Sequence, residues 1–181
     1  MRRCREQRAR GFTLLEVTVV VLVITLLTIT VTPAIRGLDS ARAAAASEEV
    51  ARRLVLARSS SMASGKPTGL SVAPSSGQFL LLEIPTSGGM PSARTDVLGA
   101  VEEAFEIEAL YGIELAGFTA PDGTTGDGVI WFGYDGTPQS RDANGTLVGP
   151  ATGDTLIELG TPTAWSIIVR RGSGHISREI P

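Results

Sequence analysis

The sequence predicts an α+β protein in which a long N-terminal helix, its first half spanning a membrane, packs on a C-terminal antiparallel β-sheet domain. Three observations favour this fold class. Five arginines precede residue 11, an apolar run occupies residues 12–35, and short β-type runs alternate with glycine-rich turns from residue 68 onward. The length of 181 residues suits one domain with an appended segment.

Charge and residue counts exclude several function classes. The net charge is −3, and because the first ten residues carry five arginines and one glutamate (+4), the remainder carries −3 − 4 = −7. An acidic body disfavours a nucleic-acid binder driven by overall basicity. Cys4 and His175 are each the single residue of their type, which excludes an intramolecular disulfide and a Cys/His zinc site. We therefore expect no enzyme activity and no cofactor.

The apolar run at residues 12–35 is long enough to span a bilayer. Sixteen of its 24 positions are apolar, and 24 helical residues cover about 36 Å against a hydrocarbon core of roughly 30 Å. The preceding arginines should stay in the cytoplasm. The sequence thus predicts a single-pass inner-membrane protein with a cytoplasmic N-terminus and a periplasmic C-terminal domain.

Glu16 is the one charged residue in this run. A buried carboxylate in an apolar segment is costly, so it marks a functional candidate that needs a positive partner. The predicted helix offers none, and the partner must come from another chain or from a new amino terminus.

The stretch around Glu16 resembles the processing motif of type IV prepilins, in Gly11-Phe12-Thr13-Leu14-Leu15-Glu16-Val17 after a short basic leader. The resemblance implies that prepilin peptidase removes residues 1–11, cutting between Gly11 and Phe12, and methylates the new Phe12 amine. Glu16 and Thr13 then occupy the family's assembly positions, and Pro33 the place of its helix-bending proline. The implied fold is pilin-like.

Elementary electrostatics agrees with this resemblance. The Phe12 amine would lie about one helical turn from Glu16, and in a filament each carboxylate can pair with a neighbour's amine. Pro33 should kink or loosen the helix. Two alternatives remain: a secretory signal peptide cleaved after Ala43, in Ala41-Arg42-Ala43, and an unprocessed single-span anchor.

The helix is expected to continue through residues 36–65 as an amphipathic segment that packs on the domain formed by residues 66–181. Gly65 and Pro67 supply the stop signal. Residues at spacings of three and four form the predicted packing face: Leu38, Ala41, Ala45, Val50, Leu54, Ala57 and Ser61.

Short β-type runs predict an antiparallel sheet of roughly six to eight strands. The segments are residues 68–72, 78–84, 101–108, 129–134, 154–159, 165–169 and 175–178. The first two should form a hairpin. In the third, Phe105 and Ile107 should point inward.

Three segments also resemble the GspH/FimT minor pseudopilins, namely residues 51–59, 130–138 and 165–176. The resemblance implies a minor pseudopilin of the type II secretion pseudopilus. Its expected partners are prepilin peptidase, other pseudopilins or pilins through the N-terminal helix, the inner-membrane assembly platform and the lipid bilayer. The alternative is a FimT-like minor pilin of a type IV pilus, with DNA binding in natural transformation.

Two further groups of residues are candidate sites. Asp122 and Asp127 lie in a glycine-rich loop and are calcium candidates, although the loop lacks the spacing of an EF-hand and reads equally as a turn. Arg170, Arg171 and Arg178 form a basic cluster that could contact phosphates. A solvated hairpin end is the favoured interpretation of the arginines, so DNA is not an expected partner.

Overall fold

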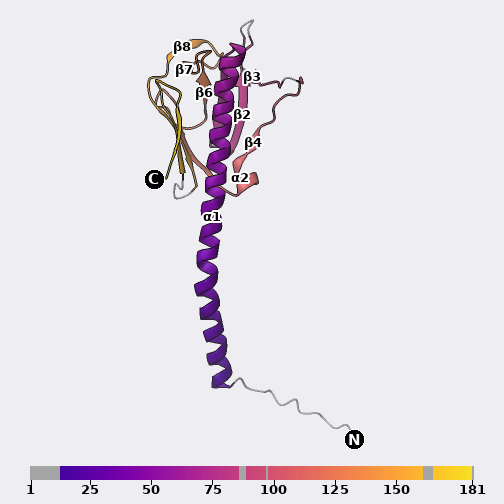
Figure 1. Cartoon of the computed structure of the whole chain (residues 1–181), viewed down its shortest axis with the longest axis vertical. Helices are drawn as coiled ribbons and strands as arrows, with labels where there is room; N and C mark the ends of the chain where they lie inside the picture. Colours follow the sequence, from indigo (N-terminus) through magenta and orange to yellow (C-terminus); the bar gives the residue numbers. More distant parts are fainter. Residues whose placement is uncertain (1–12, 86–88, 97, 161–164, 181) are drawn as a thin grey trace. The chain divides into compact units, whose positions relative to one another are not determined.

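The computed structural model describes residues 13–85, 89–96, 98–160 and 165–180, without the side chains of residues 30–37. The chain divides into two compact units, Met1–Asp39 and Ser40–Pro181. Helix α1 (Leu14–Ser64) contributes to both (Figure 1). Each unit is described by itself.

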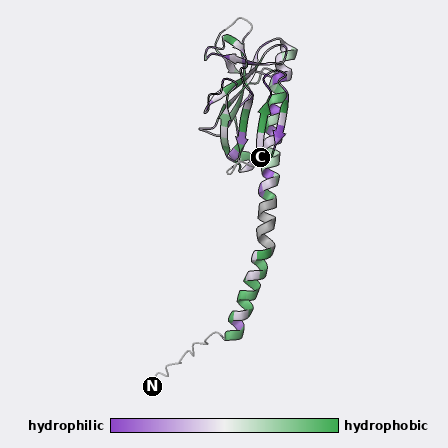
Figure 2. Ribbon diagram, turned by 90° about the vertical axis from the view of Figure 1, so that its left-hand side faces the viewer, coloured by the Kyte–Doolittle hydropathy of each residue, from purple (hydrophilic) through white to green (hydrophobic). Residues whose placement is uncertain are grey.

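In the first unit, every described side chain of α1 from Leu14 to Ile29 is exposed. Figure 2 colours most of this stretch as hydrophobic. The helix begins after Thr13, whose carbonyl oxygen accepts the Val17 N–H at 3.2 Å. An apolar helix surface therefore remains uncovered within this unit.

The predicted membrane span is wrong for the described part of the chain, where no helix is both long and apolar enough to cross a membrane. Within this part, Glu16 and the threonines Thr18, Thr25 and Thr28 interrupt the apolar side chains of α1. The pilin-like fold with a transmembrane first half, and the single-pass inner-membrane location, are corrected accordingly.

In the second unit, α1 ends where the sequence predicts. Gly65 adopts φ +67° and donates its N–H to the Ser61 carbonyl at 3.0 Å, a left-handed cap that favours glycine. The buried face of this part is Ala43, Ala46, Val50, Leu54 and Ala57.

The first part of the predicted packing face is wrong, because the buried face is rotated slightly about the helix axis from the predicted one. Leu38, Ala41 and Ala45 are exposed, whereas Ala43 and Ala46 are buried. In a run of alanines hydrophobicity does not distinguish one face from another, so the packing partner decides which face is buried. From Val50 to Ser61 the predicted face is confirmed.

Two antiparallel sheets follow the helix. The larger sheet has the order β3-β2-β1-β6-β7-β8, with β4 paired to β2, and the smaller sheet has the order β11-β10-β9-β5. The larger sheet contains β1 (Thr68–Ala73), β2 (Gln78–Glu83), β3 (Ser92–Ala93), β4 (Phe105–Glu106), β6 (Gly128–Phe132), β7 (Pro138–Arg141) and β8 (Leu147–Pro150). The smaller contains β5 (Leu115–Thr119), β9 (Thr155–Leu159), β10 (Trp165–Val169) and β11 (Ile176–Glu179).

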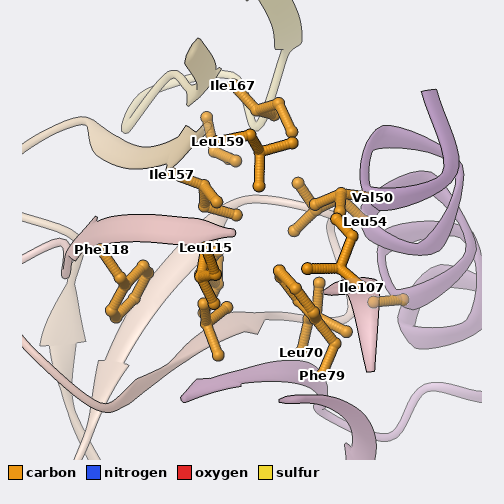
Figure 3. Close-up of a cluster of buried hydrophobic side chains, with 14 of the residues drawn as sticks. Val50, Leu54, Leu70, Phe79, Ile107, Leu115, Phe118, Ile157, Leu159 and Ile167 are labelled. Atoms are coloured by element: carbon orange, nitrogen blue, oxygen red, sulfur yellow. The ribbon is translucent and has the colours of Figure 1, made fainter. Parts of the chain in front are cut away.

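The hydrophobic core lies between the helix face and the two sheets. Figure 3 shows Val50 and Leu54 of α1 pointing toward side chains from both sheets, among them Phe79 and Ile157. Strand alternation explains the strand contributions, because every second side chain of β9 is buried, as are Ile167 and Val169 of β10. Burial of these branched and aromatic side chains is the main source of stability for this unit.

The predicted hairpin of β1 and β2 is confirmed, with Leu70 opposite Leu81. The predicted strand at residues 101–108 is mostly wrong. Only Phe105–Glu106 pair as a strand, and Ile107–Tyr111 form the short helix α2, closed by Gly112 at φ +68°. Phe105 and Ile107 are nevertheless buried as expected. The short strands β3, β5, β7 and β8 were not predicted.

Arg58 links α1 to a turn of each sheet. Its Nε donates to the Gly136 carbonyl at 3.1 Å, in the turn between β6 and β7. Its Nη2 donates to the Ser173 carbonyl at 3.0 Å, in the turn between β10 and β11. One turn of helix further on, the buried Ser61 hydroxyl donates to the Gly133 carbonyl at 2.9 Å. These bonds hold two sheet ends against one helix surface.

Replacing Thr155 by valine should raise the free energy of unfolding. The Thr155 side chain is buried, and its hydroxyl has no hydrogen-bond partner among the described residues. Removing an unsatisfied buried hydroxyl at constant volume should stabilise the protein by about 1 kcal/mol. Chemical denaturation of the full chain in detergent measures the change.

The matched control is Thr68→Val. Thr68 is equally buried, but its hydroxyl donates to the Lys66 carbonyl at 3.3 Å. We expect this variant to lose about 1 kcal/mol. Equal effects of the two substitutions would contradict the assignment of Thr155 as unsatisfied.

Candidate functional site

The start of α1 holds the two described residues of the predicted assembly motif, Thr13 and Glu16. The Glu16 backbone N–H donates to Thr13 Oγ1 at 3.3 Å and to the Thr13 carbonyl at 3.1 Å. Thr13 is thus the N-cap, and Glu16 is the third helical residue, a spacing known as the capping box. Its carboxylate also lies at the positive end of the helix dipole.

The Thr13 cap binds the backbone of Glu16, and the helix dipole offers its carboxylate a local explanation that was not predicted from the sequence. Glu16 was expected to need a partner from outside the helix. A threonine followed three residues later by a glutamate is a recognised helix-start pattern, and this signal was present in the sequence. The outside partner remains a prediction, and it now competes with a local explanation.

The other residues of the motif are not described. Gly11 and Phe12 lie outside the described residues. Pro33 lies within α1, but its side chain is among those not described. The cleavage site, the methylated amine and the proline kink therefore stay predictions.

Threonine hydroxyls in the exposed stretch of α1 are satisfied by the helix itself. Thr18, Thr25 and Thr28 each donate to the carbonyl four residues earlier, at 2.9, 2.8 and 2.8 Å. Side chains with internally bonded hydroxyls require no outside acceptor. With the surrounding valines, leucines and isoleucines they make Leu14–Ile29 an apolar surface with one charge, Glu16.

Each of the three arginines in the predicted basic cluster has a partner within the chain: an acidic side chain for Arg170 and Arg178, and a backbone carbonyl for Arg171. Arg170 bridges Asp154 at 2.8 Å and Glu179 at 3.5 Å. Arg171 Nη1 donates to the Thr152 carbonyl at 2.7 Å. These contacts join the turn between β10 and β11 to the residues just before β9.

Arg178 lies elsewhere in the same sheet. It contacts Glu48 of α1 at 3.6 Å, and its guanidinium carbon is 5.8 Å from the centre of the Trp165 ring. Two of the three arginines are therefore paired with acids, which weakens the case for a shared phosphate-binding surface.

The calcium candidates take part in separate turns. Asp122 Oδ1 accepts the Thr124 hydroxyl at 2.7 Å and the Thr124 N–H at 3.0 Å. Asp127 accepts the Ser75 hydroxyl at 2.7 Å. These bonds lower the pKa of each carboxyl from its ordinary value. Among the described residues, no three metal-ligating side chains gather to hold an ion.

Comparison with known proteins adds no relative. No family model, no curated protein and no solved structure matches this chain. The resemblance to prepilins therefore rests on residues 11–17, and that to the GspH/FimT group on the three segments named above. The apolar start of α1, with Glu16 at its first turn, is the candidate functional site.

Asp154 should contribute stability that acid removes. The Arg171 backbone N–H, and next the Arg170 guanidinium, lower the pKa of Asp154 from its ordinary value. A lowered carboxyl pKa gives stability that is present above about pH 4 and is lost as pH falls through the folded-state pKa. We expect Asp154→Asn to flatten the fall in melting temperature between about pH 5 and pH 2.

Glu179→Gln provides the control, because Glu179 contacts the same arginine at the longer distance of 3.5 Å. The fall in melting temperature of this variant at acidic pH should stay closer to that of the unsubstituted protein. An unchanged slope in Asp154→Asn would show that the Asp154 bonds do not contribute to stability in solution.

Proposed function

We propose that this chain is a structural subunit of a pseudopilus-type filament, a minor pseudopilin that prepilin peptidase processes between Gly11 and Phe12. The observation that carries the proposal is the exposure of the whole described stretch Leu14–Ile29. Exposed apolar surfaces of this extent mark interaction sites. In the proposed filament, the same stretch of neighbouring subunits covers this apolar surface.

The residues at the head of this stretch support a specific mode of assembly. Cleavage would place the Phe12 amine beside the first turn of α1, where Glu16 is the single charge among largely apolar side chains. An amine and a carboxylate that are both removed from water stabilise each other only when paired. Pairing between neighbouring subunits would therefore fix their axial positions.

The alternative, a type IV minor pilin that binds DNA, receives less support. The arginines proposed to contact phosphates are engaged by Asp154, Glu179, Thr152 and Glu48. Phosphate binding would have to compete with these contacts. We therefore favour a subunit of the secretion pseudopilus.

The processing step predicts a defined mature N-terminus. In cells with prepilin peptidase, mass spectrometry of the protein should show an N-methylated Phe12. Gly11→Ala should leave the leader attached, because a peptidase that cuts between Gly11 and Phe12 must fit the residue on each side of the bond. An N-terminus at Ala44, or normal maturation of Gly11→Ala, would overturn the proposal.

Glu16 substitutions separate assembly from helix capping. Glu16→Ala should be cleaved yet enter filaments poorly, because it removes the charge, while the Thr13 cap stays because it uses the backbone N–H of residue 16. Glu16→Gln keeps a side chain that can complete a capping box but has no charge to pair with the amine. We expect both variants to be incorporated at least about tenfold less than the unsubstituted protein, a difference of about 1.4 kcal/mol per contact.

Quantitative blotting of sheared filaments measures incorporation, and the Phe12 terminus confirms that each variant was processed. Thr13→Ala is the matched control, since it removes the cap and leaves the charge. Normal incorporation of Glu16→Gln together with poor incorporation of Thr13→Ala would show that capping, and not charge pairing, explains Glu16.

A further inference from the structure

A pocket of about 270 Å³ lies on the larger sheet, away from the residues discussed so far. Its wall comes from β2, β6 and β7, and from two loop segments, residues 90–91 before β3 and residues 142–143 after β7. The lining residues are Leu82, Met90, Pro91, Val129, Trp131, Arg141, Asp142 and Ala143. The wall is mostly apolar, with one cation and one acid.

Strand alternation places the pocket on the sheet face opposite the core. Ile130 and Phe132 of β6 belong to the core, so Val129 and Trp131 point to the other face. Trp131 is paired in register with Gln139 of β7, and Arg141, two residues later, projects on the same side. The pocket is therefore separate from the core between helix and sheets.

Trp131 forms a flat apolar wall because the neighbouring strand leaves room for its ring. A Cβ atom at Gly69 would lie 2.6 Å from Trp131 Cε3. The indole therefore lies directly on the β1 backbone, and Trp131 is 3% exposed. Any larger residue at position 69 would displace the ring.

Arg141 supplies an uncompensated positive charge. Its Nη1 donates to the Gly145 carbonyl at 2.7 Å, and its Nη2 donates to Gln139 Oε1 at 2.8 Å. Both acceptors are neutral. Nε is buried without a partner, and among the described side chains no carboxylate forms an ion pair with this guanidinium.

Burial of the Arg141 guanidinium without a counter-charge lowers its pKa from the ordinary value. A partly buried arginine normally pairs with an acid, because removing a charge from water is costly. Two of its five N–H groups have the neutral acceptors described above and Nε–H is buried, so the second N–H of Nη1 and of Nη2 can donate to an added acceptor.

Asp142 lines the same pocket but is occupied by its own turn. Its Oδ1 accepts the backbone N–H groups of Asn144 at 2.9 Å and of Thr146 at 2.8 Å. This carboxylate organises the turn between β7 and β8. The hydrogen bonds of Arg141 go to Gly145 and Gln139 instead.

We propose that this pocket binds a carboxylate carried on a short apolar stem. Arg141 takes the carboxylate, and Trp131, Val129 and Leu82 contact the stem. A volume of about 270 Å³ is at the lower end of ligand pockets, so it suits a small acid or one acidic side chain. The site is independent of the proposed assembly through α1.

Binding can be measured with benzoate as the probe and the full chain in detergent. The chain has two tryptophans, so a Trp165→Phe background makes Trp131 the sole fluorescent indole. Benzoate should change its fluorescence saturably. Benzamide, which has the same shape and no charge, should bind at least about tenfold more weakly, because hydrogen bonds to a charged group are the stronger ones.

A second arm identifies the source of the carboxylate. A blocked dipeptide, acetyl-Glu-Leu-amide, tests an acidic protein side chain against the free acid. Stronger binding of benzoate identifies a small-molecule ligand, and stronger binding of the dipeptide identifies a protein side chain. Saturable binding of either one supports the proposal, and absence of both overturns it.

Arg141→Met keeps most of the aliphatic stem and removes the charge, so it should abolish the response to benzoate. Arg170→Met is the matched control, because that arginine is exposed and paired with Asp154, and it should bind as the unsubstituted protein does. If Arg141→Met fails to fold, the comparison of benzoate with benzamide decides alone. Equal binding of the two probes overturns the proposal.

Discussion

The second unit depends on one buried strip of α1. Ala46, Val50, Leu54 and Ala57 are fully buried, and the inner faces of both sheets pack on them. Because a helix repeats every 3.6 residues, positions spaced three and four apart form a continuous strip that both sheets can share. Arg58 and Ser61 extend this strip with hydrogen bonds to turns of the larger and the smaller sheet. The helix thus joins two sheets whose strands are not paired with each other.

The same helix is built differently before this strip begins. From Leu14 to Ile29 its side chains are exposed, although most of them are as apolar as those of the core. Composition therefore indicates that a surface will be covered, but it does not identify the cover. Lipid is the cover that the sequence predicts, but no helix among the described residues is long and apolar enough to cross a membrane. The proposed cover is the same segment of other subunits.

Prediction succeeded where one local rule determined the outcome. Residues 165–169 were predicted as a strand and form β10 with the same bounds, because aromatic and β-branched residues, which favour strands, make up most of the segment. Residues 101–108 were predicted as strand, but the last two of them begin α2 (Ile107–Tyr111), since Ile107 and Tyr111 fit both periods in so short a segment. The partners of Arg170 and Arg178 lie 16 and 130 residues away along the chain, and Arg141 was not singled out. Pairing between distant residues depends on the tertiary fold, and no local pattern contains it.

The threonines of the exposed stretch have a consequence for any contact made there. Their hydroxyls bond to their own helix, so the surface presents branched methyl groups and no directional donor. Two such helices can pack at axial positions that differ by about one turn with similar contact energy, because similar apolar ridges then meet similar grooves. A surface of this kind favours association of two helices but does not fix their axial register. Register must then come from a feature at one end of the stretch, and Glu16 is the one charged side chain at that end.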